Sequence, residues 1–131
     1  MPIDRIRAME LHRRARGKIK IYPTINIVNE EDLSMAYIPG SVGPCQAIQE
    51  DEEASFDLTG RANRIAVITD GSAVLGLGPI GPVAALPVME GKCLLFKIFA
   101  DVNALPICLD STNPADVIHT AELLAPCLGG F

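Results

Sequence analysis

Two short strand-like runs, separated by a helical stretch and followed by another helix, limit most strongly how this chain can fold. The predicted strands are Ile65–Thr69, which is rich in β-branched residues, and Ala104–Leu109. The segment between them, Ile80–Met89, is rich in small residues and is predicted to be helical, with Pro87 near its end. Asn113-Pro114 has the residue types of a helix start and opens a final helix through Leu124. Strands that alternate with helices predict a small three-layer α/β domain with a largely parallel sheet.

Two segments in this region can be interpreted in more than one way. Ala73–Gly76 is short and apolar, and we expect it to form a strand that pairs back across the Asp70-Gly71 turn. Cys93–Ala100 is apolar except for Lys97, and its pattern fits a strand or a buried helix equally well.

The first half of the chain is predicted to contain short helices separated by turns. Ile6–Arg16 is expected to form a basic helix that ends at Gly17. Asn29 can cap a second helix, which must end before Pro39-Gly40. Pro44 can open a third helix in its first turn.

Charge is distributed unevenly along the chain. The net charge is −5 and the pI about 4.9, which disfavours general nucleic-acid binding. Seven basic residues nevertheless lie in the first 20 positions, and acidic clusters follow at 30–32 and 50–53. A basic arm of this kind can dock on an acidic surface of another subunit, but simple solvated charge is the favoured interpretation of the pattern. We therefore divide the chain into a basic arm, residues 1–24, and one α/β domain, residues 25–131.

The composition is typical of a globular domain. Hydrophobic residues make up 49% and charged residues 21%, and no apolar run reaches the roughly 18 residues that a membrane span needs. The basic start is not followed by the apolar region of a signal peptide, so we expect a cytoplasmic location and no membrane partner. The spacing of the four cysteines does not support a zinc site, and no role is assigned to the two histidines. Cys93 and Cys108 are expected to be buried thiols in a reducing compartment.

A glycine-rich stretch, Gly76–Gly81, matches the G-x-G-x-x-G pattern of dinucleotide sites. The context argues against a cofactor site, because too few strands remain for a full nucleotide-binding domain and Pro79 lacks the N–H that a phosphate would need. We expect tight backbone packing here instead, with the backbone of Gly71, Gly76 and Gly78 lining a substrate pocket.

Tyr37 and Lys92 are candidates for proton transfer. A phenol acts as a general acid near neutral pH only if burial or a neighbouring cation tunes it, and a lysine acts as a base only if desolvation favours its neutral form. The plainer interpretations are a tyrosine with its hydroxyl at the surface and an extended surface lysine. Arg61, Asn63 and Arg64 offer a fork for a dicarboxylate, or else form a solvated loop.

Several motifs taken together resemble the N-terminal domain of the malic enzymes, especially the shorter prokaryotic-type members. The resemblance covers nearly the whole chain from about His12. The matching segments are Tyr37-Ile38-Pro39-Gly40, Pro44-Cys45, Asn63 through Gly81, Pro87-Val88-Met89-Glu90-Gly91-Lys92, Phe96 through Asp101, and Pro106-Ile107-Cys108.

The resemblance implies an oxidative decarboxylation of malate to pyruvate that uses NAD or NADP and Mg²⁺ or Mn²⁺. It implies that Lys92 is the base that takes the malate hydroxyl proton, and that Tyr37 is the acid that protonates the enolpyruvate carbon. It also implies that Leu75–Gly81 belongs to the substrate domain, with the cofactor held by a later domain. Members of the family are at least dimeric, so a homodimer is expected.

The chain differs from the family pattern in two ways. Longer animal-type members have an arginine for the malate carboxylate where this chain has Ala73, so substrate binding must differ here. By the same resemblance, Phe131 precedes the acidic metal ligands and the cofactor domain. We therefore expect no cofactor or metal on this chain alone and no turnover by it. The alternative is a stand-alone, non-catalytic module that binds a small carboxylate or dimerises.

Overall fold

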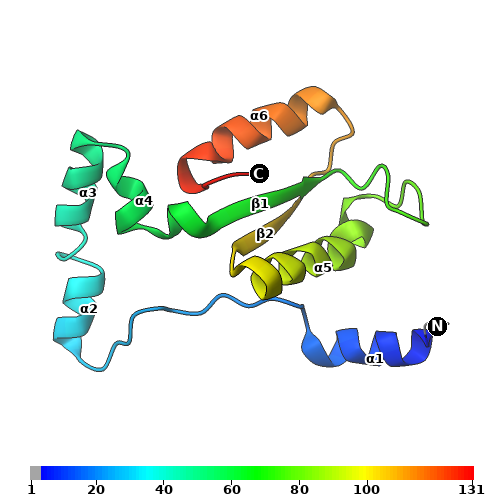
Figure 1. Cartoon of the computed structure of the whole chain (residues 1–131), viewed down its shortest axis with the longest axis horizontal. Coiled ribbons are helices and arrows are strands. Elements are labelled where there is room, and N and C mark those ends of the chain that lie inside the picture. Colours follow the sequence, from blue (N-terminus) through cyan, green and yellow to red (C-terminus); the bar gives the residue numbers. More distant parts are fainter. Residues whose placement is uncertain (1–3) are drawn as a thin grey trace. The chain divides into compact units, whose positions relative to one another are not determined.

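The computed structural model describes residues 4–131, which form two compact units (Figure 1). The first unit contains residues up to Lys20 together with Arg64–Phe131, and the second contains Ile21–Asn63. The first three residues of the predicted arm lie outside the described residues. The elements, in chain order, are α1 (Arg5–Ala15), α2 (Glu30–Ala36), α3 (Val42–Glu50), α4 (Ala54–Leu58), η1 (Gly60–Asn63), β1 (Arg64–Thr69), α5 (Pro82–Ala100), β2 (Asn103–Cys108), α6 (Pro114–Leu124) and η2 (Ala125–Cys127).

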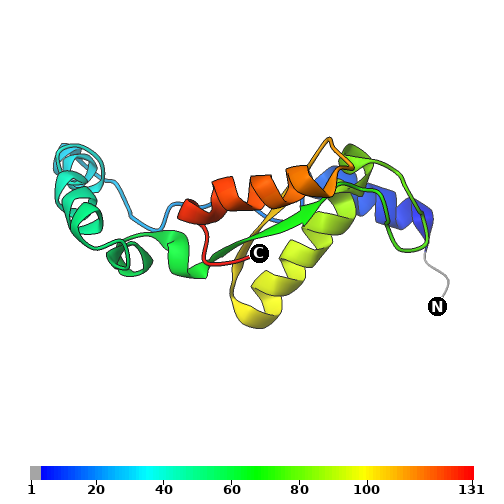
Figure 2. The same cartoon turned by 90° about the horizontal axis from the view of Figure 1, so that it is seen from above.

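The first unit is built on a β–α–β arrangement. Strands β1 and β2 pair in parallel, with Ala66 opposite Leu105, and helix α5 connects them and packs on both. Figures 1 and 2 show α5 and α6 on opposite sides of the two strands. On the other edge of β1, Gly130 accepts a hydrogen bond from the Ala66 N–H at 3.1 Å. The predicted α/β fold with a parallel sheet is therefore confirmed.

Helix α5 shows how the core forms. Ala85, Met89 and Cys93 are buried and follow one another at four-residue intervals, the spacing that places side chains on one face of a helix. This stripe packs on the small sheet residues Ala66 and Ala104, which are buried as well. The apolar run from Cys93 to Ala100 is therefore helical, and the strand alternative is wrong.

The prediction that the α5 helix ends near Pro87 was also wrong, because α5 continues to Ala100. A proline removes only its own N–H bond and strains one turn. Since the buried stripe continues past Pro87 at helical spacing, packing on the sheet favours a continuous helix. The end of α5 is set by Asp101, which takes a left-handed conformation with φ of 52°.

The predicted strand at Ala73–Gly76 does not form. The loop from Asp70 to Gly81 instead contains a tight turn, in which the N–H groups of Leu77 and Gly78 both donate to the Val74 carbonyl. Only a single bridge joins Val74 to Gly78. Two glycines with positive φ, Gly76 and Gly78, turn the chain too sharply for a strand.

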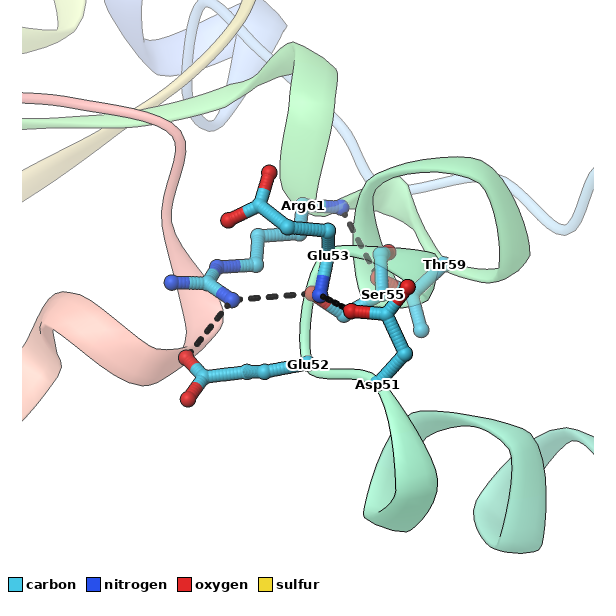
Figure 3. A network of polar contacts seen from close by, with 6 residues as sticks. All are labelled: Asp51, Glu52, Glu53, Ser55, Thr59 and Arg61. Carbon is cyan, nitrogen blue, oxygen red and sulfur yellow. Dashed lines mark hydrogen bonds and ion pairs between the residues drawn. The ribbon is translucent and has the colours of Figure 1, made fainter.

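The second unit is a series of short helices held by local hydrogen bonds. Asn29 caps α2 through its side chain, which accepts from the Asp32 N–H at 2.9 Å, as the sequence predicts. Figure 3 shows a polar network around Arg61, whose guanidinium donates to Ser55 at 2.8 Å and Glu52 at 3.2 Å. The same guanidinium lies 4.5 Å above the ring of Phe56. These contacts join η1 to α4, so Arg61 has a structural role here and does not present a free fork for a dicarboxylate.

Few residues are fully buried, and many large apolar side chains are exposed on α1, α2 and α5. Within residues 4–131, no helix is both long and apolar enough to cross a membrane.

Candidate functional site

Tyr37 lies in the turn between α2 and α3, and its side chain is 64% exposed. Its backbone is fixed by two hydrogen bonds: its N–H donates to Leu33 at 2.9 Å, and its carbonyl accepts from Ser41 at 2.7 Å. Gly40 lets the turn close, because a Cβ there would lie 1.9 Å from the Met35 carbonyl oxygen. The turn therefore presents the phenol from a fixed backbone.

Lys92 lies in the middle of α5 and is exposed, at the flank of the buried face: it follows the buried Met89 by three residues and directly precedes the buried Cys93. Three exposed apolar residues lie at helical spacing from it: Val88 four residues before Lys92, and Leu95 and Phe99 three and seven residues after it. We call these three residues and Lys92 the α5 stripe. Any surface that covered this stripe would also remove water from the Lys92 amine.

The chain segment that follows α1 is anchored on α5 close to Lys92. The N–H of Lys18 donates to Glu90 at 3.3 Å, and the Lys18 ammonium donates to the Pro87 carbonyl at 2.5 Å. A Cβ on Gly91 would lie 3.9 Å from that ammonium. Sequence reasoning missed this contact, which joins residues about 70 positions apart and has no local signal.

A hollow of about 430 Å³ lies where the carboxyl ends of both strands meet. It is lined by polar residues and by turn residues: Asp70, Gly71, Ser72, Pro79, Gly81, Pro82, Asp110, Ser111 and Thr112. Of the three glycines predicted to line a substrate pocket, Gly71 lies in this hollow, whereas Gly76 and Gly78 are not among its lining residues. The contribution of residues 110–112 was missed, although parallel strands bring their carboxyl ends to one edge.

The Asp70 carboxylate is held in place at the rim of this hollow. Its Oδ1 accepts from the Ser72 N–H at 2.9 Å and from the Ser72 hydroxyl at 2.7 Å. These bonds favour the charged carboxylate and lower the pKa of Asp70 from its ordinary value of 3.8. The hollow therefore has an anionic wall at neutral pH.

Two observations on residues 4–131 bear on cofactor binding. Among residues 4–131, no group of three His, Cys, Asp or Glu side chains could hold a metal ion. The G-x-G-x-x-G segment belongs to the loop that ends at Gly81, and a Cβ on Gly76, Gly78 or Gly81 would meet no atom within 4 Å. All three glycines have a positive φ, so their role in this structure is to turn the chain.

Comparisons with known proteins agree with one another. Residues 15–123 match the family described as "Malic enzyme, N-terminal domain". The chain is 49% identical over 123 residues to the bifunctional malic/malolactic enzyme of Bacillus subtilis, covering 94% of this chain and 30% of that enzyme. It is also 49% identical to the NAD-dependent malic enzyme of Geobacillus stearothermophilus, covering 88% of this chain and 24% of that enzyme.

Solved structures give the same result. The NAD-dependent malic enzyme of Thermotoga maritima superposes with a TM-score of 0.91 at 46% identity, covering 98% of this chain and 36% of that one. The malic enzyme of Pyrococcus horikoshii superposes with a TM-score of 0.94 at 42% identity, covering 98% and 30%. The chain thus spans about a third or less of the length of these relatives. It belongs to the malic enzyme family and corresponds to the N-terminal domain of its members.

Proposed function

We propose that this chain is the acid–base part of an NAD(P)-dependent malic enzyme, which converts malate to pyruvate and CO₂. The observation that carries the proposal is the family match over residues 15–123, which includes both Tyr37 and Lys92. Both side chains are exposed on well-defined backbone, so a substrate can reach each of them.

Each residue has one proton to move. The amine of Lys92 accepts the hydroxyl proton of malate as C2 becomes a ketone, and the hydride lost from C2 would be taken up by NAD⁺ or NADP⁺ held elsewhere in the enzyme. After CO₂ has left, the Tyr37 hydroxyl donates a proton to C3 of the resulting enolate, which gives the methyl group of pyruvate. We assign no step to a nucleotide or a metal ion in this chain, and we propose that NAD or NADP and Mg²⁺ or Mn²⁺ bind elsewhere in the enzyme.

A chimeric enzyme tests the proposal. The matching segment of the Bacillus subtilis malic/malolactic enzyme is replaced by this chain, and malate-dependent NAD(P)H formation is measured. We expect an active chimera, in which Lys92→Ala lowers turnover by roughly 10²–10⁴-fold, the usual contribution of one general acid–base group. Tyr37→Phe should reduce pyruvate formation more than hydride transfer to oxaloacetate.

The chain offers a matched control for each variant. Lys20 and Tyr22 are both exposed and have no role in the proposed chemistry, so Lys20→Ala and Tyr22→Phe should leave turnover unchanged. A folded but inactive chimera would contradict the proposal and favour a non-catalytic carboxylate-binding or dimerisation module. The isolated 131-residue chain is expected to be inactive.

The location and partners belong to the same proposal. We propose a cytoplasmic enzyme, with which the four free cysteines are compatible. We also propose that it forms homodimers, since exposed apolar faces such as the α5 stripe usually acquire a partner.

A further inference from the structure

We propose that helix α1 docks on the acidic turn between α3 and α4 of a second copy of this chain. The acidic turn consists of four consecutive exposed residues, Glu50, Asp51, Glu52 and Glu53. The contact is independent of malate chemistry and specifies which surfaces meet.

Helix α1 is well specified by its sequence but poorly covered. Asp4 caps its start by accepting from two backbone N–H groups, and Arg16 ends it in a left-handed conformation. An isolated helix of 11 residues is only marginally stable in water, so α1 gains from docking. Every residue from Asp4 to Arg16 except Ala8 is nevertheless exposed.

The exposed surface of α1 combines apolar and basic side chains. Ile6, Met9 and Leu11 are each more than half exposed. A shallow hollow lies along the helix and is lined by residues of α1 and its cap alone, so its other wall is open. Among residues 4–131, none of the arginines of this helix forms an ion pair.

Charge complementarity indicates the occupant. Residues 4–20 contain seven basic and two acidic residues, which gives a formal charge of +5. Residues 21–63 contain one basic and eight acidic residues, which gives −7. In the acidic turn, Glu52 pairs with Arg61, whereas the carboxylates of Glu50 and Glu53 have no partner among the described residues.

A second copy is favoured because every copy carries both surfaces. In a two-fold dimer, each α1 meets the acidic turn of the partner, so the same contact forms twice. The anchored Lys18 holds the end of α1 to α5, which limits the entropy lost when α1 docks. Complementary charge mainly adds specificity and faster association, and the apolar side chains of α1 add buried area.

Charge reversal tests the contact by sedimentation velocity of the 131-residue chain at low ionic strength. Arg5→Glu with Arg7→Glu reverses α1, and Glu50→Lys with Glu53→Lys reverses the acidic turn. Arg5→Glu, Arg7→Glu and Glu50→Lys suit the helix dipoles, whereas Glu53→Lys places a cation at the N-cap of α4, so circular dichroism is needed to show that the helices remain intact. Each double variant should raise the dimer dissociation constant by about 10- to 100-fold, as expected for opposed charges at two sites.

Mixing the two double variants gives the sharpest result. Reversed α1 then meets a reversed turn at one contact, and native α1 meets a native turn at the other, so the mixture should dimerise nearly as well as the native chain. Glu122→Lys on α6 is the matched control, because it changes an exposed acid outside both surfaces and should have no effect.

Four outcomes would overturn the proposal. A native chain that is monomeric at high micromolar concentration would do so, as would a dimer that neither variant weakens. If each variant weakens the dimer but mixing the two does not restore dimerisation, α1 contacts its own chain. If reversing α1 abolishes binding to anionic vesicles or to RNA but leaves the dimer intact, the partner of α1 is a polyanion.

Discussion

Replacing Gly71 by alanine should destabilise the domain much more than replacing Gly76, although both glycines have nearly the same φ, 72° and 77°. At Gly71, an added Cβ would lie 2.2 Å from both the carbonyl carbon and the carbonyl oxygen of Gly81. Real Cβ contacts essentially never fall below 3.0 Å, so the two sides of the loop must separate by about 1 Å. At Gly76, the added methyl group would meet no atom within 4 Å.

The structure indicates the size of the difference. Separating the loop at Gly71 breaks the hydrogen bonds from the Ile80 and Gly81 N–H groups to the Gly71 carbonyl, at 3.1 and 3.2 Å. Each bond contributes about 0.5–1.5 kcal/mol, and a left-handed alanine costs about 1–2 kcal/mol. Gly71→Ala should therefore cost about 2–5 kcal/mol, and Gly76→Ala only about 1–2 kcal/mol.

Urea unfolding followed by circular dichroism measures both variants. With a slope of about 2 kcal/mol per molar urea, the midpoint of Gly71→Ala should lie about 0.5–1.5 M below that of Gly76→Ala. Equal midpoints would show that the loop can open at Gly71 without lowering the free energy of unfolding, and would refute the close-approach argument. An unchanged slope is the control, because it shows that the two variants expose the same surface on unfolding.

Two further predictions concern titrating groups. Ser72→Ala removes the hydroxyl bond to Asp70 and should raise the pKa of that carboxyl toward 3.8, which an NMR titration would detect. Because the pKa of Asp70 is depressed in the folded state, the hydrogen bonds to its carboxylate stabilise the fold above the unfolded-state pKa. This stabilisation is lost as the pH falls through the folded-state pKa. Burial raises the pKa of the Cys93 thiol, so an alkylating reagent at neutral pH should modify the exposed Cys45 first. It should reach Cys93 only when the chain unfolds, and mass spectrometry can follow the order of modification.

Elements with local signals could be predicted from the sequence. Asn113 and Pro114 are residue types that start a helix, and α6 runs through Leu124 as expected. Asn29 behaves in the same way at α2. Local signals gave a wrong prediction where tertiary packing decides the structure. Pro87 predicts the end of a helix, but α5 continues to Ala100 because its buried residues pack on the sheet.

The candidate site shows the same division. Tyr37 and Lys92 were proton-transfer candidates from the residues themselves, a tyrosine beside a turn and a lysine opening an apolar run, but ordinary surface positions explained both more simply until the family resemblance gave them roles. The anchor between Lys18 and Glu90 depends on the folded chain and could not be predicted. The presence of Asp110 and Asp70 around one hollow could have been predicted, because both follow strands that were expected to be parallel.

The α5 stripe connects the fold to the proposed chemistry. The same helix buries Ala85, Met89 and Cys93 and leaves Val88, Leu95 and Phe99 exposed near Lys92. A lysine in water is protonated at neutral pH and cannot act as a base, whereas a covered apolar stripe favours the neutral amine. Under the proposed function, a surface that covers this stripe would bury apolar area and would also remove water from the Lys92 amine. Assembly and proton transfer would then depend on one face of one helix, and a change such as Leu95→Glu should impair both together while leaving the buried stripe intact.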